Sequence, residues 1–487
     1  MARASWVAGA AAIAFAGIAS AQPYPFPPPA APPRPLTIAA PVEQSLANGL
    51  RVITARRDDV PLVSVLLVVL SGSEADPPAL SGLASMTAGL LTQGTTRHTA
   101  PQLAAAAEAL GGSLDSSAGW GQSTVSITVT TPKLDAALGL VAEVAREPVF
   151  AQEEIDRLRA QMLDGLKVSY ANPSRIATLA AVRLAYGASA WGHPAGGTPT
   201  SLPRIVRADL VAAHAVAFRP DRAVLILSGD IDPSTALSLA RARFGSWQAP
   251  ATSPAPVPVV PAAAAPGPAL TVIDMPSASQ AGVTMTLPLP PRRDNEWATG
   301  AVLNAVLGGG YSSRLNQEIR IKRGLSYGAD SYISGRERSG LFVASVQTKN
   351  ETAAQVVGLA QAEIDTMAAA PVGAAELAAR KAMIVGGFSR SVETTAGLAS
   401  AIDGLVVSGR SPALLTTQID SIEKVDADAV QRYAAAHLGV AGRRVVVAGV
   451  ADRIVGELSS GGAPVDVIRA DQLDLDRVDL KRPATAR

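Results

Sequence analysis

The chain has 487 residues, of which 48% are apolar and 17% charged, and its formal net charge at pH 7 is +1. This length suits two or more domains rather than one ordinary core. The near balance of charge gives no indication of nucleic acid or of an acidic macromolecule as a partner. The sequence has no cysteine, which excludes disulfides, thiol catalysis and a lipid-anchored cysteine.

The first residues have the pattern of an export signal. Arg3 precedes an apolar run from Trp6 to Ile18, and Ala19-Ser20-Ala21 forms a small-x-small cleavage sequence. This pattern predicts a signal peptide over residues 1–21, cleaved near Ala21, and a periplasmic or secreted product. The alternative, a transmembrane anchor, requires a longer run of about 20 apolar residues, so no stable membrane insertion is expected.

Two proline-rich stretches divide the rest of the chain. Residues 22–40 are predicted to form an extended spacer, and residues 249–268 a Pro/Ala-rich linker. They leave two bodies of similar length, residues 41–248 and 269–468. The final residues 469–487 are highly charged without an apolar face, which predicts a mobile polar tail.

Strand and helix signals follow one another in the first body. Asn48-Gly49 lies between short apolar runs, which is typical of a hairpin, and "LVSVLLVVLSGS" and "STVSITVTT" predict strands. Apolar periodicity with proline or glycine at the ends predicts helices at about 80–92, 101–112, 133–146 and 151–186.

The second body begins and ends like the first. It starts with the strand "QAGVTMTLPLP" and the helix "NEWATGAVLNAVLGG", and its final strand "GRRVVVAGVAD" resembles the "RPDRAVLILSGDID" that closes the first body. These parallels suggest duplication. Without steady βαβ alternation, the order predicts an α+β fold of two similar domains, each a largely antiparallel sheet covered by helices on one side.

An ordered set of segments resembles the insulinase/pitrilysin-like zinc peptidases. The segments are "GLASMTAGLLTQGT", "FAQEEIDRLRAQMLDGL", "WGHPAGGTPTSLPRIVRADLVAAHAVAFRPDRAVLILSGDID" and "YSSRLNQEIRIKRGLSYGADS", and the similarity spans Val42 to Val455. The resemblance implies that the two domains form half of a clamshell around a peptide.

The zinc-binding motif of that family is missing. Active members carry HxxEH on the first helix, with the glutamate as general base on a metal-bound water. The matching positions here are Ser85, Ala88 and Gly89, and the later glutamate ligand falls at Gly165, or at Asp164 if the register is shifted by one residue. Serine, alanine and glycine side chains cannot hold Zn²⁺, so no metal is expected in this chain.

No other catalytic centre is evident in the sequence. The four histidines, His98, His193, His214 and His437, do not share helical spacing, and there is no G-x-S-x-G nucleophile motif. His193 in "WGHPAGGTP" is interpreted as a structural turn residue. "LGGGYSSRL" lacks the end of a phosphate-binding loop and is interpreted as a turn before a helix.

Arg320 and Tyr327 are the candidate functional residues. The resemblance places them on the family's Arg/Tyr pair, which hydrogen-bonds the substrate backbone and the developing oxyanion. Guanidinium is a permanent forked donor and phenol a neutral one, so both suit a carbonyl oxygen that gains negative charge. The alternative is an exposed helical Arg320, with Arg323 an equally plausible neighbour, and a Tyr327 packed in a strand.

The sequence therefore predicts a chain that is not an enzyme alone. The leading hypothesis is a non-catalytic, substrate-binding subunit of a zinc peptidase heterodimer, whose zinc and HxxEH motif belong to a similar partner chain. Peptides or unfolded polypeptides would be its substrates. Two alternatives remain: a structural or assembly subunit with no peptide substrate, and a peptide-binding or chaperone-like protein that acts alone.

Overall fold

The computed structural model describes residues 38–249, 269–291, 296–335 and 339–483. The predicted signal peptide, nearly all of the first spacer and almost the whole linker lie outside these residues. We call the described residues 38–249 the N-terminal half and those from 269 onward the C-terminal half. Within the described residues, no helix is both long enough and apolar enough to cross a membrane.

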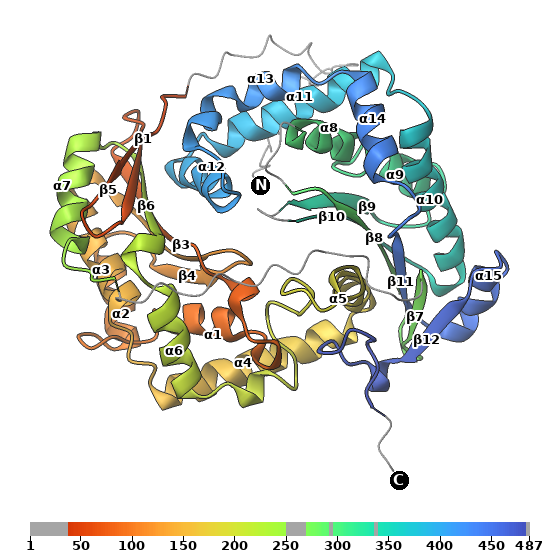
Figure 1. Cartoon of the computed structure of the whole chain (residues 1–487), viewed down its shortest axis with the longest axis horizontal. Coiled ribbons are helices and arrows are strands. Elements are labelled where there is room, and N and C mark those ends of the chain that lie inside the picture. The colour runs from red at the N-terminus through yellow and green to blue at the C-terminus, as the bar shows by residue number, and fades with distance from the viewer. Residues whose placement is uncertain (1–37, 250–268, 292–295, 336–338, 484–487) are drawn as a thin grey trace, which may run out of the picture. The chain divides into compact units, whose positions relative to one another are not determined.

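Each half contains one six-stranded sheet (Figure 1). The N-terminal half consists of β1 (Val42–Ser45), β2 (Arg51–Arg56), β3 (Leu62–Val69), α1 (Leu83–Leu90), α2 (Ala100–Ala109), β4 (Asp115–Ala118), β5 (Ser123–Thr130), α3 (Leu134–Arg146), α4 (Gln152–Ala171), α5 (Pro173–Tyr186), α6 (Arg207–Ala217), β6 (Ala223–Gly229) and α7 (Pro233–Phe244).

The C-terminal half consists of β7 (Leu270–Asp274), β8 (Ala281–Leu289), α8 (Trp297–Leu307), α9 (Arg314–Asn316), β9 (Ala329–Gly335), β10 (Gly340–Thr348), α10 (Ala353–Ala369), α11 (Ala374–Ser391), α12 (Thr395–Val407), α13 (Gln418–Glu423), α14 (Ala427–His437), β11 (Arg444–Gly449), α15 (Val455–Ser459) and β12 (Val465–Arg469).

The two sheets share a topology, as the duplication hypothesis predicts. Their strand orders are β1-β2-β6-β3-β5-β4 and β12-β7-β11-β8-β10-β9. The pairs β2–β6 and β7–β11 are parallel, and the three pairs that follow in each sheet are antiparallel. The two sheets differ in their first strand: β1 comes at the start of its half in the sequence, whereas β12 comes at the end of its half. The prediction of two similar, largely antiparallel α+β domains is confirmed.

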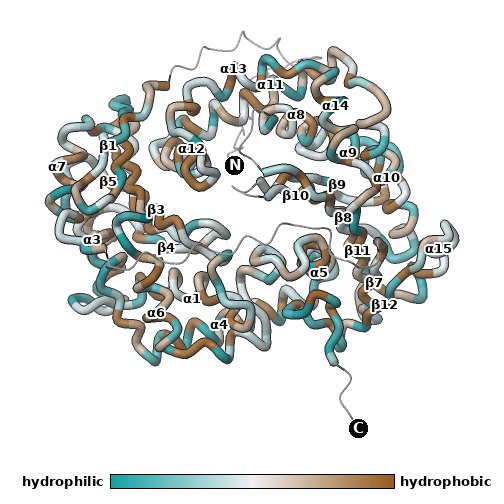
Figure 2. Tube along the Cα trace, viewed as in Figure 1, coloured by the Kyte–Doolittle hydropathy of each residue, from teal (hydrophilic) through white to brown (hydrophobic). Residues whose placement is uncertain are grey.

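The core of each half lies between one face of its sheet and the helices of the same half. In the first, β3 and β5 contribute alternate buried residues against α1 and α3. In the second, β8 and β10 pack against α8, α10 and α14. Apolar colouring runs along β3 in Figure 2, as expected for a central strand that is buried on both faces.

The second face of each sheet receives a helix from the other half. Helix α5 of the N-terminal half packs on β8 and β11, and α12 of the C-terminal half packs on β3 and β6 (Figure 1). Ile176, Ala180 and Leu184 of α5 enter a cluster with Val446 and Ala448 of β11. The exchange is reciprocal, because each sheet is covered on this face by a helix that the other half supplies.

The single helix predicted over 151–186 is wrong. Pro173 has no backbone N–H and ends α4 at Ala171, and the Asn172 side chain accepts a hydrogen bond from Arg175 N to begin α5. After this break α5 packs on β8 and β11 of the C-terminal half.

The expectation of a mobile C-terminal tail is wrong for residues 469–483. Leu473, Leu475 and Leu480 are buried and join the cluster around α5. Arg183 of α5 donates hydrogen bonds to the backbone oxygens of Asp476 and Arg477. Three buried leucines and the partner that Arg183 provides fix a segment whose composition alone resembles a solvated tail.

Candidate functional site

The helix that corresponds to the zinc-binding helix is intact and closely packed. It is α1, and Ser85, Ala88 and Gly89 lie on it as the motif spacing requires. Ser85 Oγ donates a hydrogen bond to Ala195 O at 2.7 Å, and Ala88 is fully buried. A Cβ built on Gly89 would lie 3.1 Å from Leu158 Cδ2. Ala88 is therefore enclosed, whereas Ser85 and Gly89 are half-buried with Ala195 and Leu158 against them.

Helix α4 is the neighbour of α1, which is where the last zinc ligand is expected. Leu158 of α4 contacts Gly89, and Gly165 lies seven residues further along α4 on the same stripe. Gly165 is exposed, with no atom within 4 Å of a Cβ built on it. Asp164, the alternative position, points to solvent and pairs with Lys167 at 2.8 Å.

Within the described residues, no three His, Cys, Asp or Glu side chains form a group that could hold a metal ion. The four histidines lie apart. His98 contacts Glu143, His214 stacks on Phe218, and His437 lies 3.6 Å from Glu296.

His193 belongs to a buried arrangement at the start of α1. Its Nε2 lies 3.8 Å from Asp76 Oδ2, and its ring lies 5.4 Å from that of Trp120. Asp76 accepts hydrogen bonds from Gly82 N and Ala84 N and so caps α1. Burial raises the pKa of Asp76 to about 7. This environment supports the structural interpretation of His193.

Arg320 and Tyr327 lie on either side of one turn in the C-terminal half. Arg320 belongs to a stretch of π-helix, Gln317–Ile321, in which Lys322 N donates to Gln317 O. Such turns are rare and occur often at functional sites. Tyr327 lies two residues before the edge strand β9 and is 89% exposed. The alternative of a tyrosine packed in a strand is therefore wrong.

The structure distinguishes Arg320 from its neighbour Arg323. The side chain of Arg323 donates to the Glu318 carboxylate, and Lys322 Nζ lies 2.7 Å from the same carboxylate. These two hydrogen bonds hold the pKa of Glu318 below its usual range. Among the described residues no carboxylate pairs with Arg320, whose guanidinium instead lies 4.8 Å from the ring centre of Tyr311. Arg320 is the cation that remains available to a ligand.

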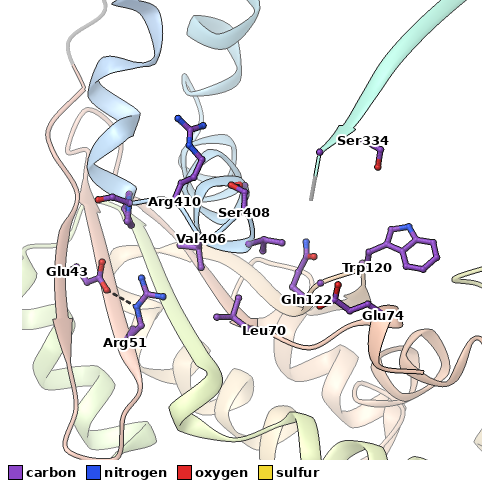
Figure 3. A pocket seen from close by; sticks show the side chains of 18 residues that line it. Glu43, Arg51, Leu70, Glu74, Trp120, Gln122, Ser334, Val406, Ser408 and Arg410 are labelled. Carbon is purple, nitrogen blue, oxygen red and sulfur yellow. Dashed lines mark hydrogen bonds and ion pairs between the residues drawn. The ribbon is translucent and has the colours of Figure 1, made fainter. Parts of the chain in front are cut away.

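A separate cavity of about 680 Å³ lies where the end of α12 meets the N-terminal half (Figure 3). Its charged groups are engaged with protein neighbours: Arg51 Nε with Glu43 at 2.7 Å, and Glu74 with Trp191 Nε1 at 2.9 Å. Asp403 of α12 lies beside the cavity residue Gln122, and burial raises the pKa of Asp403 to about 6. The cavity lies apart from Arg320 and Tyr327, neither of which lines it.

Sequence reasoning missed two residues that the geometry brings forward. Asp76 looks like one of many loop acids, and only its burial against α1 reveals its role. Tyr311 occurs in the quoted "LGGGYSSRL", and an aromatic after three glycines was a usable signal. Its position over Arg320 depends on the π-helical turn, which periodicity does not predict.

These features define a two-domain peptidase-like fold in which the positions of the metal ligands carry side chains that cannot bind a metal. The sequence matches two models of one family, insulinase (peptidase family M16) over residues 51–197 and the peptidase M16 inactive domain over residues 204–384. The chain belongs to the insulinase-like M16 peptidase family and lacks its catalytic motif.

Relatives and solved structures agree with this assignment. An uncharacterized zinc protease of Mycobacterium tuberculosis is 27% identical over 85% of this chain and 96% of its own length. One of Mycobacterium leprae is 29% identical over 81% and 91%. The crystal structure of a peptidase M16 inactive domain from Pseudomonas fluorescens superposes with a TM-score of 0.77 at 25% identity, over 85% of this chain and 98% of that one. A protease from Helicobacter pylori has the same fold, with a TM-score of 0.78 at 18% identity over 85% and 100%.

Proposed function

We propose that this chain is the non-catalytic, substrate-binding subunit of a zinc metallopeptidase whose HxxEH motif lies on a second, similar chain. One contrast carries the proposal. Helix α1 is folded and packed but presents Ser85 and Gly89 where ligands are needed, whereas Arg320 and Tyr327 offer hydrogen-bond donors at the surface.

The two donors suit a peptide carbonyl under attack. During hydrolysis its oxygen gains negative charge, and donors aimed at that charge contribute on the order of 3 kcal/mol each. Arg320 supplies a permanent positive charge and Tyr327 a neutral O–H. In the proposed assembly the partner supplies zinc and the general base, and the two chains close as a clamshell around the peptide.

The peptide would be held as an added strand on a sheet edge, which reads the backbone more than the side chains. Part of one such edge is already engaged: in β9, Ala329 N donates to Asn316 Oδ1 and Ser331 N to Gly308 O. These two donors are removed from strand addition. At β4, the corresponding edge strand of the N-terminal half, Ser116 Oγ donates to Ala88 O of α1 at 2.7 Å, so that edge lies directly beside the altered helix.

The assembly would work outside the cytoplasm. The support for this part of the proposal is the signal-like pattern of residues 1–21. Secretion of the mature chain, with an N-terminus at Gln22, would test it by N-terminal sequencing.

The proposal is tested by reconstitution. The chain is purified alone and with a similar HxxEH-bearing chain, sought first in the neighbouring reading frame, and hydrolysis of an unstructured casein peptide is followed. We expect no hydrolysis by the chain alone and chelator-sensitive hydrolysis by the pair. Arg320→Ala and Tyr327→Phe should each lower kcat by up to about 100-fold, with the assembled mass unchanged.

Arg323→Ala is the matched control, because Arg323 lies three residues away and is paired with Glu318. It should leave kcat near the wild-type value. The Arg320 and Tyr327 variants could also retain full turnover when assembled with an active partner chain. In that case the two residues have no role in catalysis, and the chain is a structural or assembly subunit.

A further inference from the structure

Tyr311 is a large aromatic residue at the surface that contacts one of the proposed substrate-binding groups. Its side chain is 64% exposed, and its ring centre lies 4.8 Å from Arg320 Cζ. An exposed tyrosine is ordinary by itself. A guanidinium over its ring is an attractive cation–π arrangement.

The backbone that carries this ring is fixed on both sides. Asn316 is buried, and its Nδ2 donates to Tyr311 O while its Oδ1 accepts from Ala329 N. On the other side, Arg380 of α11 donates to Ser312 Oγ at 2.5 Å. The turn is therefore tied to β9 and to α11, and its ring is held on a rigid support.

Asn316 also connects the segment that carries Tyr327 to the residue that contacts Arg320. Ala329, which donates to Asn316, lies two residues after Tyr327, and Tyr311, which accepts from it, lies against Arg320. One buried amide thereby fixes the platform of the arginine relative to the segment that carries the tyrosine.

We propose that Tyr311 is a positioning residue that orients the Arg320 guanidinium toward a bound peptide carbonyl. A guanidinium stacked on a ring uses its flat face for that contact and keeps the N–H groups at its edge for an acceptor. The ring thus limits the rotamers of a long side chain without occupying its donors. This inference rests on the proposed function.

The stacking is tested first, by side-chain NMR of the full mature chain. The Arg320 Nε–Hε signal is assigned by its loss in Arg320→Lys. We expect Tyr311→Leu to move that signal, because the ring current is removed, and Tyr311→Phe to leave it in place. An Arg320 signal that does not respond to Tyr311→Leu overturns the inference.

Peptide binding is tested next, by fluorescence anisotropy with a labelled oxidised insulin B chain as the probe. Arg320→Ala should weaken binding, and Tyr311→Leu should weaken it by about two- to fivefold, the range expected for an exposed cation–π contact. Tyr311→Phe should bind like the wild type, which excludes the phenol O–H as a direct substrate contact. Adding Tyr311→Leu to Arg320→Ala should cause no further loss, since the ring acts through the arginine.

The outcomes separate the two proposals. If Arg320→Ala binds the probe as tightly as the wild type, the proposed substrate-binding role of the pair fails, and this inference with it. If Arg320→Ala weakens binding but the Tyr311→Leu effect is absent or simply adds to it, only the inference fails. Circular dichroism of each variant confirms that the comparison is between folded chains.

Discussion

Ser85 Oγ of α1 donates a 2.7 Å hydrogen bond to Ala195 O, which ties the helix that matches the family's HxxEH helix to the segment around Ala195. The turn that contains Ala195 also brings His193 next to Asp76 at the start of that helix. The altered position is therefore half-buried, with Ala195 O bonded to Ser85 and Leu158 lying against Gly89.

Restoring the motif should not restore zinc binding. In a chain carrying Ser85→His, Ala88→Glu, Gly89→His and Gly165→Glu, the new side chains at 85 and 89 meet Ala195 O and Leu158. Overpacking of this kind costs about 1–3 kcal/mol per site. We expect substoichiometric zinc by mass spectrometry and a lowered Tm. Stoichiometric zinc in a variant of wild-type stability would contradict this view, and adding Leu158→Ala should partly relieve the loss.

Stability should fall as pH rises from about 4 to 7. Burial raises the pKa of Asp76 from 3.8 to about 7, so the folded state holds this proton more tightly than the unfolded state across that range. The contribution is fully present below pH 4 and lost above pH 7. Each pKa unit corresponds to about 1.4 kcal/mol, which limits the effect to on the order of 4 kcal/mol.

Urea unfolding between pH 4 and 8 measures this dependence. Asp76→Asn should be less stable at pH 5 and show a flatter profile. Asp403, whose pKa burial raises to about 6, acts in the same direction, so Asp403→Asn should flatten the profile only below pH 6. A wild-type stability that rises between pH 4 and 7 would show that other groups dominate.

Neither half should fold by itself. A fragment of residues 38–249 lacks α12, which covers β3 and β6, and its own α5 has no sheet to cover. We expect each fragment to bind a dye specific for exposed apolar surface and to be cleaved rapidly by proteases. Coexpression of residues 38–249 with 269–483 should yield a soluble complex. A monomeric, protease-resistant N-terminal fragment would contradict this expectation.

Helix α12 is also joined to the sheet that it covers by a polar contact whose removal is measurable. Ser64 of β3 and Thr395 of α12 lie 2.8 Å apart through their hydroxyl oxygens, in a buried position. Thr395→Val should lower the free energy of unfolding by about 1 kcal/mol, the usual net value of one such hydrogen bond. Ser64 keeps Thr128 as a partner, so a much larger loss would indicate that α12 itself is displaced.

The C-terminal segment should contribute to stability. Leu475 is buried against the cluster around α5, and Leu475→Ala should cost about 2–5 kcal/mol, the range for leucine deletions in a core. Lys481→Ala is the matched surface control and should cost less than about 1 kcal/mol, because its ion pair with Asp466 is exposed. Chemical denaturation of the wild type and of both variants measures the free energy of unfolding of each.

Much of the fold follows from local sequence patterns. Alternation in "STVSITVTT" gives β5, and Asn48-Gly49 gives the β1–β2 hairpin, in which Gly49 has a φ of +92°. What local patterns do not show is which apolar surfaces meet. The buried stripe of α5 looks the same whichever sheet it covers, and Leu473, Leu475 and Leu480 follow no regular period.

The candidate site was likewise predicted from the sequence only in part. Positions 85, 88 and 89 were located through the resemblance to the family's HxxEH helix, and the structure places them on α1, which contacts α4. The roles of Asp76 and Tyr311 depend on contacts between distant segments and on an irregular turn, which a single sequence does not encode in any simple pattern.

The crossing of α5 and α12 restricts how this molecule can move. Drawing one sheet away from the other would strip a helix from each of them, so a hinge between the halves would expose two apolar faces at once. Because each half supplies a helix to the other, the two halves should move together as one rigid body. In the proposed assembly, opening to admit a peptide would then take place between this chain and its partner, without a hinge between the two halves.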